Sequence, residues 1–549
     1  MDRFYNAPEN VVDEILGGVA TTAPLRMAEP ESGLRILVRK EWDRQQQGRA
    51  QVAVLSGGGA GHEPAHTGFV GEGMLTGVIS GSLFASPSVE AVLAAIREVC
   101  GDAGCLLVVK NYTGDRLNFG LAAERARGEG LDVAMVIVGD DVAIDEAPQP
   151  RGIAGTLLVH KLAGYLASRK VPLDEIRAQA ESLCAHMGSM GMALRPAAQP
   201  GHDPAARSPE LGLGIHNETG TREVAPQSAD DAMRLVLDPL RQQLTGRQLS
   251  GPWIVMLNDL GSCSTQELGV LADSLLRQLG IEQITHLIGP APLMTSLDMH
   301  GFSVTLLSAQ EAFVTALTAP TQAPAWPGLK TVAPPEYFTP DSRQERDSLS
   351  DNAPQDDRVI ASLQRVIDTL RQAREDLDAL DAKSGDGDAG ASMRSGADAI
   401  AAALEARRLN TRALPSLFAG IGQLLSRDMG GSSGVLLSIL FTAAGAALDQ
   451  RGDLGTALAA GVEKMQAYGG AKPGDRTMID ALVPAIEALQ RGESLQQAAQ
   501  AARNGAEATA ALTQANAGRS AYVPESALSG VVDPGAEAVA RVFEALAAS

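Results

Sequence analysis

The 549-residue chain is poor in cysteine, in aromatic residues and in positive charge. Its four cysteines include no Cys-x-x-Cys pair, which argues against a disulfide framework or a thiolate zinc site and indicates a reducing compartment. Aromatic residues make up only 3%, while alanine and glycine are abundant, a composition that favours closely packed helices. The net charge of −21 argues against nucleic acid or an anionic membrane as partner, because both attract clustered lysine and arginine.

Long apolar runs are missing as well. No run reaches the roughly 18 apolar residues of a membrane span, and residues 1–14 carry acidic side chains in place of the apolar core of a signal peptide. The longest apolar run, residues 435–448, is interrupted by polar residues and glycine, and we interpret it as a buried helix. We therefore expect a cytoplasmic protein that does not bind a membrane.

Short β-branched runs alternate with helical stretches between about residues 51 and 317. This alternation predicts an α/β fold with mainly parallel strands, and open sheets of this kind bind ligands at the carboxyl ends of the strands. The loops SGGGAGHEPAH, NYTGD and GDD follow the first three predicted strands. The predicted strands cover residues 52–55, 106–109, 133–138, 253–257 and 304–307.

The strand signals end at a proline-rich and then charged stretch. We predict an α/β domain over residues 1–330, a linker over 331–355 and an all-α domain of about eight helices over 356–549. The first domain could itself divide into subdomains at about 1–185 and 186–330. All eight histidines precede the all-α domain, so a metal bound there would need oxygen ligands.

Three aspartates, Asp381, Asp386 and Asp388, surround one tight turn in the all-α domain. Converging carboxylates are typical ligands of a hard cation, and together with a triphosphate they could hold two Mg²⁺ ions. The alternative is a plain turn between helices, because glycine and aspartate dominate turns. An EF-hand fits poorly, since the twelfth position from Asp386 is Ala397 instead of glutamate.

A loop rich in glycine and serine, residues 429–434, leads directly into the apolar run. Its free N–H groups, hydroxyls and helix N-terminus suit a phosphate, although such residues often serve only as a helix N-cap. The chain contains neither the GxxxxGK(S/T) loop nor the HRD and DFG motifs of protein kinases. Phosphate chemistry would therefore need a different scaffold.

A second glycine-rich segment, SGGGAGH at residues 56–62, lets the backbone approach a small ligand and places His62 beside it. The glycines could equally serve a bare turn. A lone histidine such as His216 is usually a hydrogen-bonded structural residue. Spacing by itself does not join these residues to the aspartates.

Several long motifs follow one another along the chain: SGGGAGHEPAHTGF, VKNYTGDRLNFGLAAE, RGIAGT, ELGLGIHNE, DAKSGDGDAG, MGGSSGVL, GGAKPGDRTMIDAL, GRSAYVPES and VVDPGA. Together and in this order they resemble the dihydroxyacetone kinase family, and most of all its single-chain, ATP-dependent bacterial members. The resemblance implies an α/β ketone-binding domain followed by a nucleotide-binding, eight-helix antiparallel barrel.

The resemblance implies a covalent mode of substrate binding. His216 would attack the substrate carbonyl and hold it as a hemiaminal, so that glycerol, which has no carbonyl, would bind poorly. His62 would assist by hydrogen bonding, and Asp115 would act as the base toward the substrate hydroxyl. The remaining pocket residues would be Gly59, Ala60, Gly61 and Lys110.

In the helical domain the resemblance makes Asp381, Asp386 and Asp388 the Mg²⁺ ligands of an ATP site. Phosphate groups would lie against Ala389, Gly390, Ala391, Ser392, Ser432 and Ser433. The base and ribose would lie against Gly470, Met478, Arg519, Asp533, Pro534 and Gly535.

The implied activity is the ATP-dependent phosphorylation of dihydroxyacetone, and of glyceraldehyde or related short ketoses, by a homodimer that exchanges its nucleotide domains. Two alternatives stay open. Some fused relatives release a cyclic flavin nucleotide from flavin adenine dinucleotide as lyases, and relatives of the first domain act as ketone-sensing regulators. The aspartate cluster and the phosphate loop argue against a regulator, which would need neither.

One position departs from the family pattern. Asn217 follows His216 where glycine is expected. Asparagine tolerates the left-handed backbone conformation better than most residues. We expect the anchoring histidine to survive and the pocket to change slightly, in favour of a longer ketose such as erythrulose.

Overall fold

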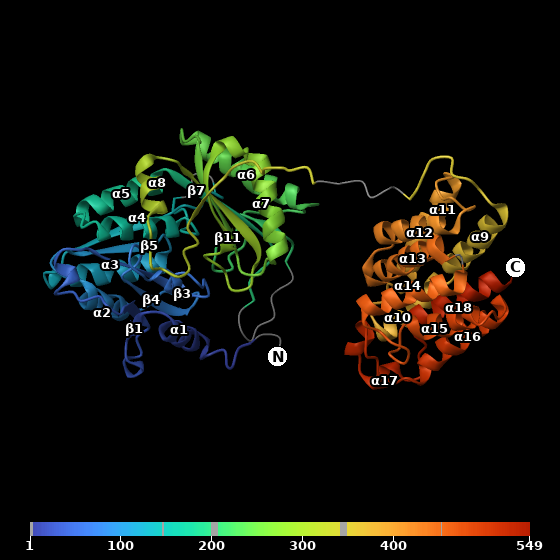
Figure 1. Cartoon of the computed structure of the whole chain (residues 1–549). Coiled ribbons are helices and arrows are strands. Elements are labelled where there is room, and N and C mark those ends of the chain that lie inside the picture. Colours follow the sequence, from blue (N-terminus) through green and yellow to red (C-terminus); the bar gives the residue numbers. More distant parts are fainter. Residues whose placement is uncertain (1–3, 145–147, 199–206, 341–347, 452, 549) are drawn as a thin grey trace. The chain divides into compact units, whose positions relative to one another are not determined.

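The computed structural model describes residues 4–144, 148–198, 207–340, 348–451 and 453–548. The chain falls into two compact units, Met1–Tyr337 and Phe338–Ser549. In Figure 1 the first unit combines strands with helices, and the described part of the second unit is entirely helical. The predicted order of an α/β domain followed by an all-α domain is thereby confirmed.

The first sheet has six strands in the order β1-β2-β4-β3-β5-β6. The pairs β4/β3, β3/β5 and β5/β6 are parallel, whereas β1/β2 and β2/β4 are antiparallel. The strands are β1 (Leu25–Met27), β2 (Ile36–Arg39), β3 (Ala53–Ala60), β4 (Gly77–Leu83), β5 (Cys105–Lys110) and β6 (Val133–Val138).

Helices cover both faces of this sheet. Leu106 and Val108 of β5 pack in the same apolar cluster as α4 and α5, whereas Leu107 packs in the cluster that contains α2 and α3. A strand buried on both faces is apolar throughout, which explains the continuous apolar runs in the sequence. The helices are α1 (Val11–Thr22), α2 (Val89–Val99), α3 (Thr113–Gly128), α4 (Thr156–Ser168) and α5 (Leu173–Ala185).

The second sheet has seven strands in the order β13-β11-β10-β12-β7-β8-β9. Among its described pairs only β10/β11 is parallel, so the prediction of mainly parallel strands is wrong for this sheet. The reason is that β11 and β12 follow one another without a crossover helix between them. The strands are β7 (Met187–Arg195), β8 (Glu210–Leu211), β9 (Arg222–Glu223), β10 (Trp253–Asp259), β11 (Ile284–Pro292), β12 (His300–Ser308) and β13 (Leu329–Thr331).

Two helices pack on one face of the second sheet, and its other face joins the core of the first. Val255 and Leu257 of β10 pack with α6 and α7, whereas Ile254 and Met256 lie in the cluster shared with α4 and α8. The shared core brings loops of both sheets to one place within the unit. The helices are α6 (Ala229–Gly246), α7 (Thr265–Leu279) and α8 (Glu311–Thr318).

The predicted linker is shorter than expected. Residues 348–355 pack against the helical unit: Leu349 and Ala353 are each 4% exposed, and the Ser350 N–H donates to the Arg408 carbonyl at 3.1 Å. Single apolar residues in a polar segment give no periodic signal, so the sequence pattern could not reveal this packing. Residues 341–347 of the predicted linker lie outside the described residues.

Eight helices of the second unit form a closed ring in the order α9, α11, α12, α13, α14, α15, α16 and α18, with α18 contacting α9. This ring is the predicted eight-helix barrel, to which α10 and α17 are additions. The helices are α9 (Asp357–Gln372), α10 (Arg374–Ser384), α11 (Ala389–Glu405), α12 (Leu414–Leu424), α13 (Gly431–Arg451), α14 (Leu454–Gly469), α15 (Ile479–Gln490), α16 (Leu495–Ala508), α17 (Glu525–Leu528) and α18 (Pro534–Ala547).

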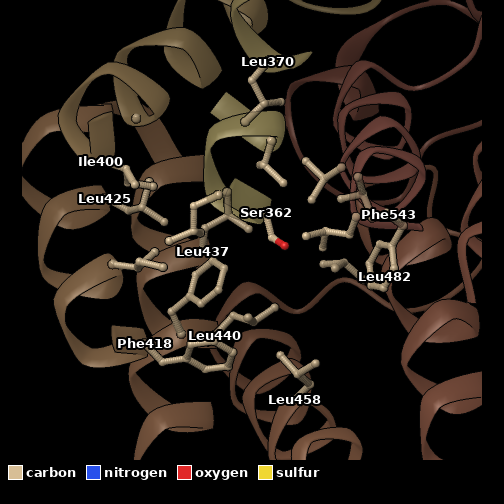
Figure 2. A pocket seen from close by; sticks show the side chains of 18 of the residues that line it. Ser362, Leu370, Ile400, Phe418, Leu425, Leu437, Leu440, Leu458, Leu482 and Phe543 are labelled. Carbon is tan, nitrogen blue, oxygen red and sulfur yellow. The ribbon is translucent and has the colours of Figure 1, made fainter. Parts of the chain in front are cut away.

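The ring encloses an apolar cavity of about 470 Å³, to which all eight helices contribute (Figure 2). The interpretation of residues 435–448 as a buried helix is wrong in part. By length and composition α13 is the one helix in the described residues that could cross a membrane, yet only 28% of its most apolar window is buried. The reason is the ring, because Leu437 and Phe441 face the cavity instead of a filled core.

Candidate active site

Two histidines from different sheets meet in the first unit. His62 follows β3, and His216 lies in the loop between β8 and β9. Their Nε2 atoms are 3.2 Å apart, and His62 Nδ1 donates to the Thr295 carbonyl at 2.9 Å. His62 is fully buried, and this burial, with the neighbouring Lys110 charge, holds its pKa well below the usual value. The neutral His62 ring therefore directs its Nε2 lone pair toward His216.

Glu218 holds the other side of His216. Its Oε2 accepts a hydrogen bond from the His216 backbone N–H at 2.8 Å, and its Oε1 lies 3.6 Å from His216 Nδ1. Burial raises the pKa of Glu218, but the hydrogen bonds and charge of His216 and the hydrogen bond of the Glu218 backbone N–H together outweigh it, so that the net pKa is lowered. Glu218 is therefore a carboxylate that orients the His216 ring. The sequence analysis missed it, although it stands two residues after the predicted anchor.

Lys110 and Asp115 lie beside the histidine pair, and both are buried. Lys110 ends β5, while Asp115 lies in the first turn of α3 and not in the predicted loop. Both adjoin Gly58, where an added Cβ would come within 2.5 Å of Lys110 Nζ and 3.5 Å of Asp115 Oδ2. Asp115 Oδ1 is buried without a hydrogen-bond partner among the described residues. This buried cluster of side chains thus offers an unpaired carboxylate oxygen close to an amine.

The glycine-rich segment beside them is mostly strand. β3 continues to Ala60, so the prediction that SGGGAGH forms a loop holds only for its last residues. An added Cβ at Gly59 would lie 2.6 Å from the backbone nitrogen of Ala85, which leaves room only for glycine. Gly61 has a φ of +99° and turns the chain from the strand to His62. These glycines therefore allow the end of β3 to pack closely against the backbone of Phe84 and Ala85.

Asn217 adopts a left-handed backbone conformation with a φ of +64°. Glycine reaches this conformation without strain, and asparagine reaches it more easily than other residues do. Its side chain adds a polar group next to His216, and Asn217 Oδ1 is buried without a partner among the described residues. The substitution therefore preserves the turn and changes the chemistry beside His216.

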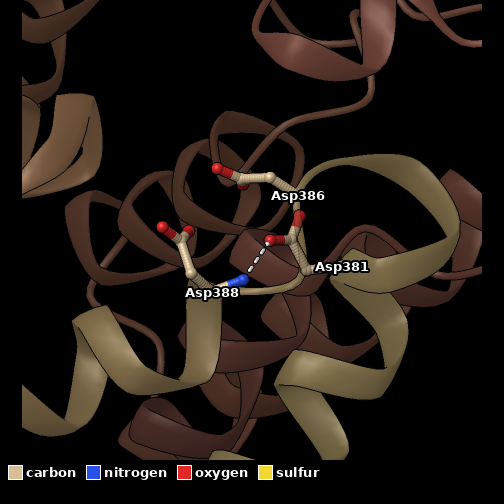
Figure 3. A group of neighbouring side chains, drawn as sticks. All are labelled: Asp381, Asp386 and Asp388. Atoms are coloured by element: carbon tan, nitrogen blue, oxygen red, sulfur yellow. Dashed lines mark hydrogen bonds between the residues drawn. The ribbon is translucent and has the colours of Figure 1, made fainter. Parts of the chain in front are cut away.

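The three predicted aspartates gather around the turn between α10 and α11 (Figure 3). Asp381 Oδ2 accepts hydrogen bonds from the backbone N–H groups of Gly387, Asp388 and Ala389, at 3.0, 3.0 and 3.2 Å. Gly387 has a φ of +82°, which makes this tight return of the chain possible. One carboxylate oxygen from each of Asp381, Asp386 and Asp388 lies within 4.8 Å of the other two.

This donor set fits Mg²⁺. In an octahedral site with metal–oxygen distances of about 2.1 Å, opposite ligands are about 4.2 Å apart. Carboxylate oxygens within 4.8 Å of one another are therefore close to the spacing that one ion, or two ions bridged by phosphate, would impose. A cation would also offset the repulsion between the three negative charges.

The glycine–serine loop and the aspartates line one cleft of about 620 Å³. A π-helical turn, Leu425–Met429, precedes the loop, and Gly430 and Gly431 have φ values of +70° and +63°. Ser432 and Ser433 lie in the first turn of α13, where backbone N–H groups lack partners within the helix. The cleft therefore combines carboxylates for a metal with N–H and hydroxyl donors for phosphate.

Other predicted nucleotide residues divide into two groups. Ala389, Ser392, Met478, Asp533, Pro534 and Gly535 line the cleft. Gly390 and Ala391 instead serve the packing of α11 on α10: an added Cβ at Gly390 would lie 2.0 Å from the Arg374 carbonyl oxygen, and the Ala391 N–H donates to Asp378 Oδ1 at 3.0 Å. These two residues and the α14 cap Gly470 are not among the described residues that line the cleft.

Arg476 lines the cleft, whereas the side chain of the predicted nucleotide residue Arg519 lies outside the described residues. Arg476, which the sequence analysis did not single out, is fully buried and donates from Nη2 to the Val531 carbonyl at 2.8 Å. It neighbours Asp533, whose pKa burial raises to about 6. Arg476 ties the loop before α15 to the loop before α18, and both loops border the cleft.

Comparison with known proteins identifies the family. Residues 18–325 match the Dak1 domain, and residues 383–548 match the DAK2 domain. The chain is 43% identical to the dihydroxyacetone kinase of Citrobacter freundii, with 100% of this chain and 99% of that protein covered. The chain belongs to the dihydroxyacetone kinase family. His62 and His216 lie in the Dak1 match, and Asp386 and Asp388 lie in the DAK2 match.

One further relative and one solved structure extend the comparison. The human protein named triokinase/FMN cyclase is 40% identical, with 99% of this chain and 98% of that protein covered. A crystal structure of the C. freundii kinase in complex with AMP-PNP and Mg²⁺ covers 100% of this chain and 99% of that chain, with 42% identity and a TM-score of 0.77. The kinase family fold therefore extends over both units.

Proposed function

We propose that this chain transfers the γ-phosphoryl group of ATP to a hydroxyl of dihydroxyacetone, and that it also accepts glyceraldehyde or related short ketoses. The observation that carries the proposal is the approach of the His62 and His216 Nε2 atoms to 3.2 Å, beside the buried side chains of Lys110 and Asp115. The relation to the C. freundii dihydroxyacetone kinase supports the choice of substrate.

His216 anchors the substrate as a hemiaminal. His216 Nε2 gives the proton that it shares with His62 to that residue and adds to the carbonyl carbon, and His62 delivers the proton to the carbonyl oxygen as the C=O double bond becomes a C–O single bond. The His216 ring therefore stays neutral in the product, and the Glu218 carboxylate beside Nδ1 orients it. A substrate without a carbonyl cannot form this bond, so glycerol should be a poor substrate.

Asp115 is the base for phosphoryl transfer. Its unpaired Oδ1 takes the proton of the substrate hydroxyl, the hydroxyl oxygen bonds to the γ-phosphorus, and ADP leaves. Lys110 lines the same pocket with Gly59, Ala60 and Gly61. The covalent anchor fixes the orientation of the substrate. Orientation is the main requirement of this step, because the protein forms no covalent bond to the transferred phosphoryl group.

Asp381, Asp386 and Asp388 hold Mg²⁺, as two ions with ATP, and Ser432 and Ser433 contact its phosphates. Bound Mg²⁺ supplies neutralisation of the negative charge on the triphosphate and on the leaving ADP. The AMP-PNP and Mg²⁺ complex of the C. freundii kinase supports this assignment. The base and ribose lie toward Met478 and the start of α18.

The chain acts as a homodimer in which each nucleotide domain serves the partner's ketone domain. This part of the proposal rests on the resemblance to fused kinases and on the length of the segment between the units. We place the enzyme in the cytoplasm, where ATP is supplied and the four cysteines, all free thiols, stay reduced. Neither nucleic acid nor a membrane is expected as a partner.

Coupled ATP turnover with Mg²⁺ tests the proposal. The substrates are dihydroxyacetone, glyceraldehyde, erythrulose and glycerol, and Asp386→Ala is the control without a complete metal site. The proposal expects turnover of the carbonyl compounds only, and its loss in Asp386→Ala. Equal turnover of glycerol, or ATP consumption that survives Asp386→Ala, would contradict it.

A second candidate activity is flavin adenine dinucleotide lyase, which forms cyclic FMN. The 40% identity to the human triokinase/FMN cyclase favours it. Release of a cyclic flavin product with Mn²⁺, retained in His216→Ala and lost in Asp386→Ala, would assign it to the nucleotide domain. A ketone-sensing regulator, by contrast, would bind dihydroxyacetone without any ATP turnover.

A further inference from the structure

Next to the His62–His216 pair lies a row of buried polar groups, of which the proposed reaction uses only Lys110. His66 Nε2 is 2.9 Å from Lys110 Nζ, and His160 Nε2 is 3.0 Å from Ser56 Oγ. The two imidazole rings are neighbours, with centroids 5.1 Å apart. His66 is 4% exposed, and His160, Ser56 and Lys110 are fully buried. A polar row of this kind in an apolar core needs a reason, because an apolar side chain would cost less to bury.

We propose that His66 is a positioning residue for the phosphoryl acceptor step: its Nε2 holds Lys110 as a charged group beside Asp115 while Asp115 takes the substrate proton. This inference rests on the proposed function. It assigns to the last histidine of the HEPAH segment a role that acts through Lys110, without contact to the substrate.

The directions of the hydrogen bonds follow from the partners. An amine donates, so His66 Nε2 accepts from Lys110 and the proton of the neutral His66 ring sits on Nδ1. Ser56 Oγ donates to the Val108 carbonyl at 2.7 Å, so it accepts from His160 Nε2–H. The two rings therefore take opposite tautomers, and neither of their Nδ1 atoms has a partner among the described residues.

Electrostatics explain why Lys110 needs such an acceptor. Burial lowers the pKa of Lys110, while the charges of Asp115 and Glu63 work in the opposite direction. The other titratable groups that face it are three histidines, His62, His66 and His160, and burial holds the pKa of each of them far below the usual value. These rings stay neutral, so His66 can accept from the ammonium without adding a second positive charge.

A purely structural role for His66 makes a different prediction. If His66 only filled space, any side chain of similar size that folds would serve, and the pH dependence of turnover would not move. If it stabilises the charged form of Lys110, loss of the acceptor makes Lys110 lose its proton at lower pH. The sign is fixed by the chemistry: a lysine that loses a hydrogen-bond acceptor has a lower pKa, so activity should fall earlier on the alkaline side.

The test is the alkaline limb of kcat/KM for dihydroxyacetone in His66→Gln and His66→Asn. Glutamine places its amide oxygen near the position of Nε2, whereas asparagine places it near Nδ1, out of reach of Lys110. In His66→Asn we expect the limb to move to lower pH by about one unit, because a hydrogen bond to a charged group is worth about tenfold or more. His66→Gln should restore the wild-type limb, and the KM for ATP should stay unchanged in both.

Thermal unfolding of both variants checks that they fold. If His66→Asn does not fold, His66→Leu replaces it, and its alkaline limb should shift to lower pH in the same way. A shifted limb that glutamine restores supports the inference. An unshifted limb, or the same limb in the glutamine and asparagine variants, overturns it. Failure of the wild-type chain to phosphorylate any carbonyl compound would instead contradict the proposed function, so the two failures are distinguishable.

Discussion

Single residues set the chemistry of the ketone pocket, and Asn217 is the one that departs from the family pattern. Its φ of +64° is a conformation that glycine also adopts, so Asn217→Gly should change the free energy of unfolding by less than about 1 kcal/mol. The loss of its buried, unpaired Oδ1 should shift the ratio of kcat/KM values from erythrulose toward dihydroxyacetone.

Gln248→Gly is the matched control for this change. Gln248 has a similar φ of +61°, but it lies after helix α6, whereas Asn217 follows His216. Gln248→Gly should leave substrate preference unchanged. An identical preference ratio in the wild type, Asn217→Gly and Gln248→Gly would remove the role of Asn217 in specificity.

At this scale the sequence pointed to candidate residues but not to how they support one another. The fold brings His62, Lys110, Asp115 and His216 together. Glu218 was not predicted, because an acidic residue near a histidine is common in sequences. Its role follows from the hydrogen bond that its Oε2 accepts from the His216 backbone N–H. Residues that are distant in the sequence come into contact only through the fold, and a local sequence pattern does not indicate such a contact.

Helix packing sets the geometry of the metal site. An added methyl at Gly390 would lie 2.0 Å from the Arg374 carbonyl oxygen and 2.8 Å from Asp378 Oδ1. Gly390→Ala should therefore push the start of α11 away from α10, reduce the free energy of unfolding by about 1–3 kcal/mol and weaken binding of Mg²⁺ and AMP-PNP. Thermal unfolding and titration calorimetry measure the two effects.

Gly269→Ala is the control for this helix–helix contact, because an added Cβ there meets nothing within 4 Å on α7. It should leave nucleotide binding unchanged and slightly stabilise the helix. Wild-type metal and nucleotide affinity in Gly390→Ala would contradict the view that the contact between α10 and α11 fixes the aspartates.

Sequence patterns predicted the positions of the strands more accurately than they predicted which strands pair with one another. The five predicted strands all lie in or overlap observed strands, because buried strands are continuous apolar runs. The direction of pairing in the second sheet was predicted wrongly, since the sequence of β11 and β12 does not tell which neighbour each strand chooses. The start of the glycine-rich loop was also misplaced, because Gly57 and Gly58 look like turn residues and instead pair with β4.

For the whole molecule, the division into two units places the ketone pocket and the metal site in different domains. If nucleotide domains are exchanged within a dimer, two inactive variants should complement each other. In a mixed dimer of His216→Ala and Asp386→Ala, one site combines an intact ketone domain with an intact nucleotide domain. Co-expressed chains with different tags, purified as mixed dimers, should regain turnover, whereas each variant alone should have none. Inactive mixed dimers would show that each chain serves itself.

The central claim is that His216 holds the ketone covalently while phosphate is transferred. The direct measurement is NMR of dihydroxyacetone labelled with ¹³C at the carbonyl, bound to protein labelled with ¹⁵N in histidine. The account predicts a one-bond coupling between the labelled carbon and a histidine Nε2 in the wild type, and its absence in His216→Ala. A wild-type enzyme that turns over dihydroxyacetone while its bound substrate has no carbon–nitrogen coupling would contradict it.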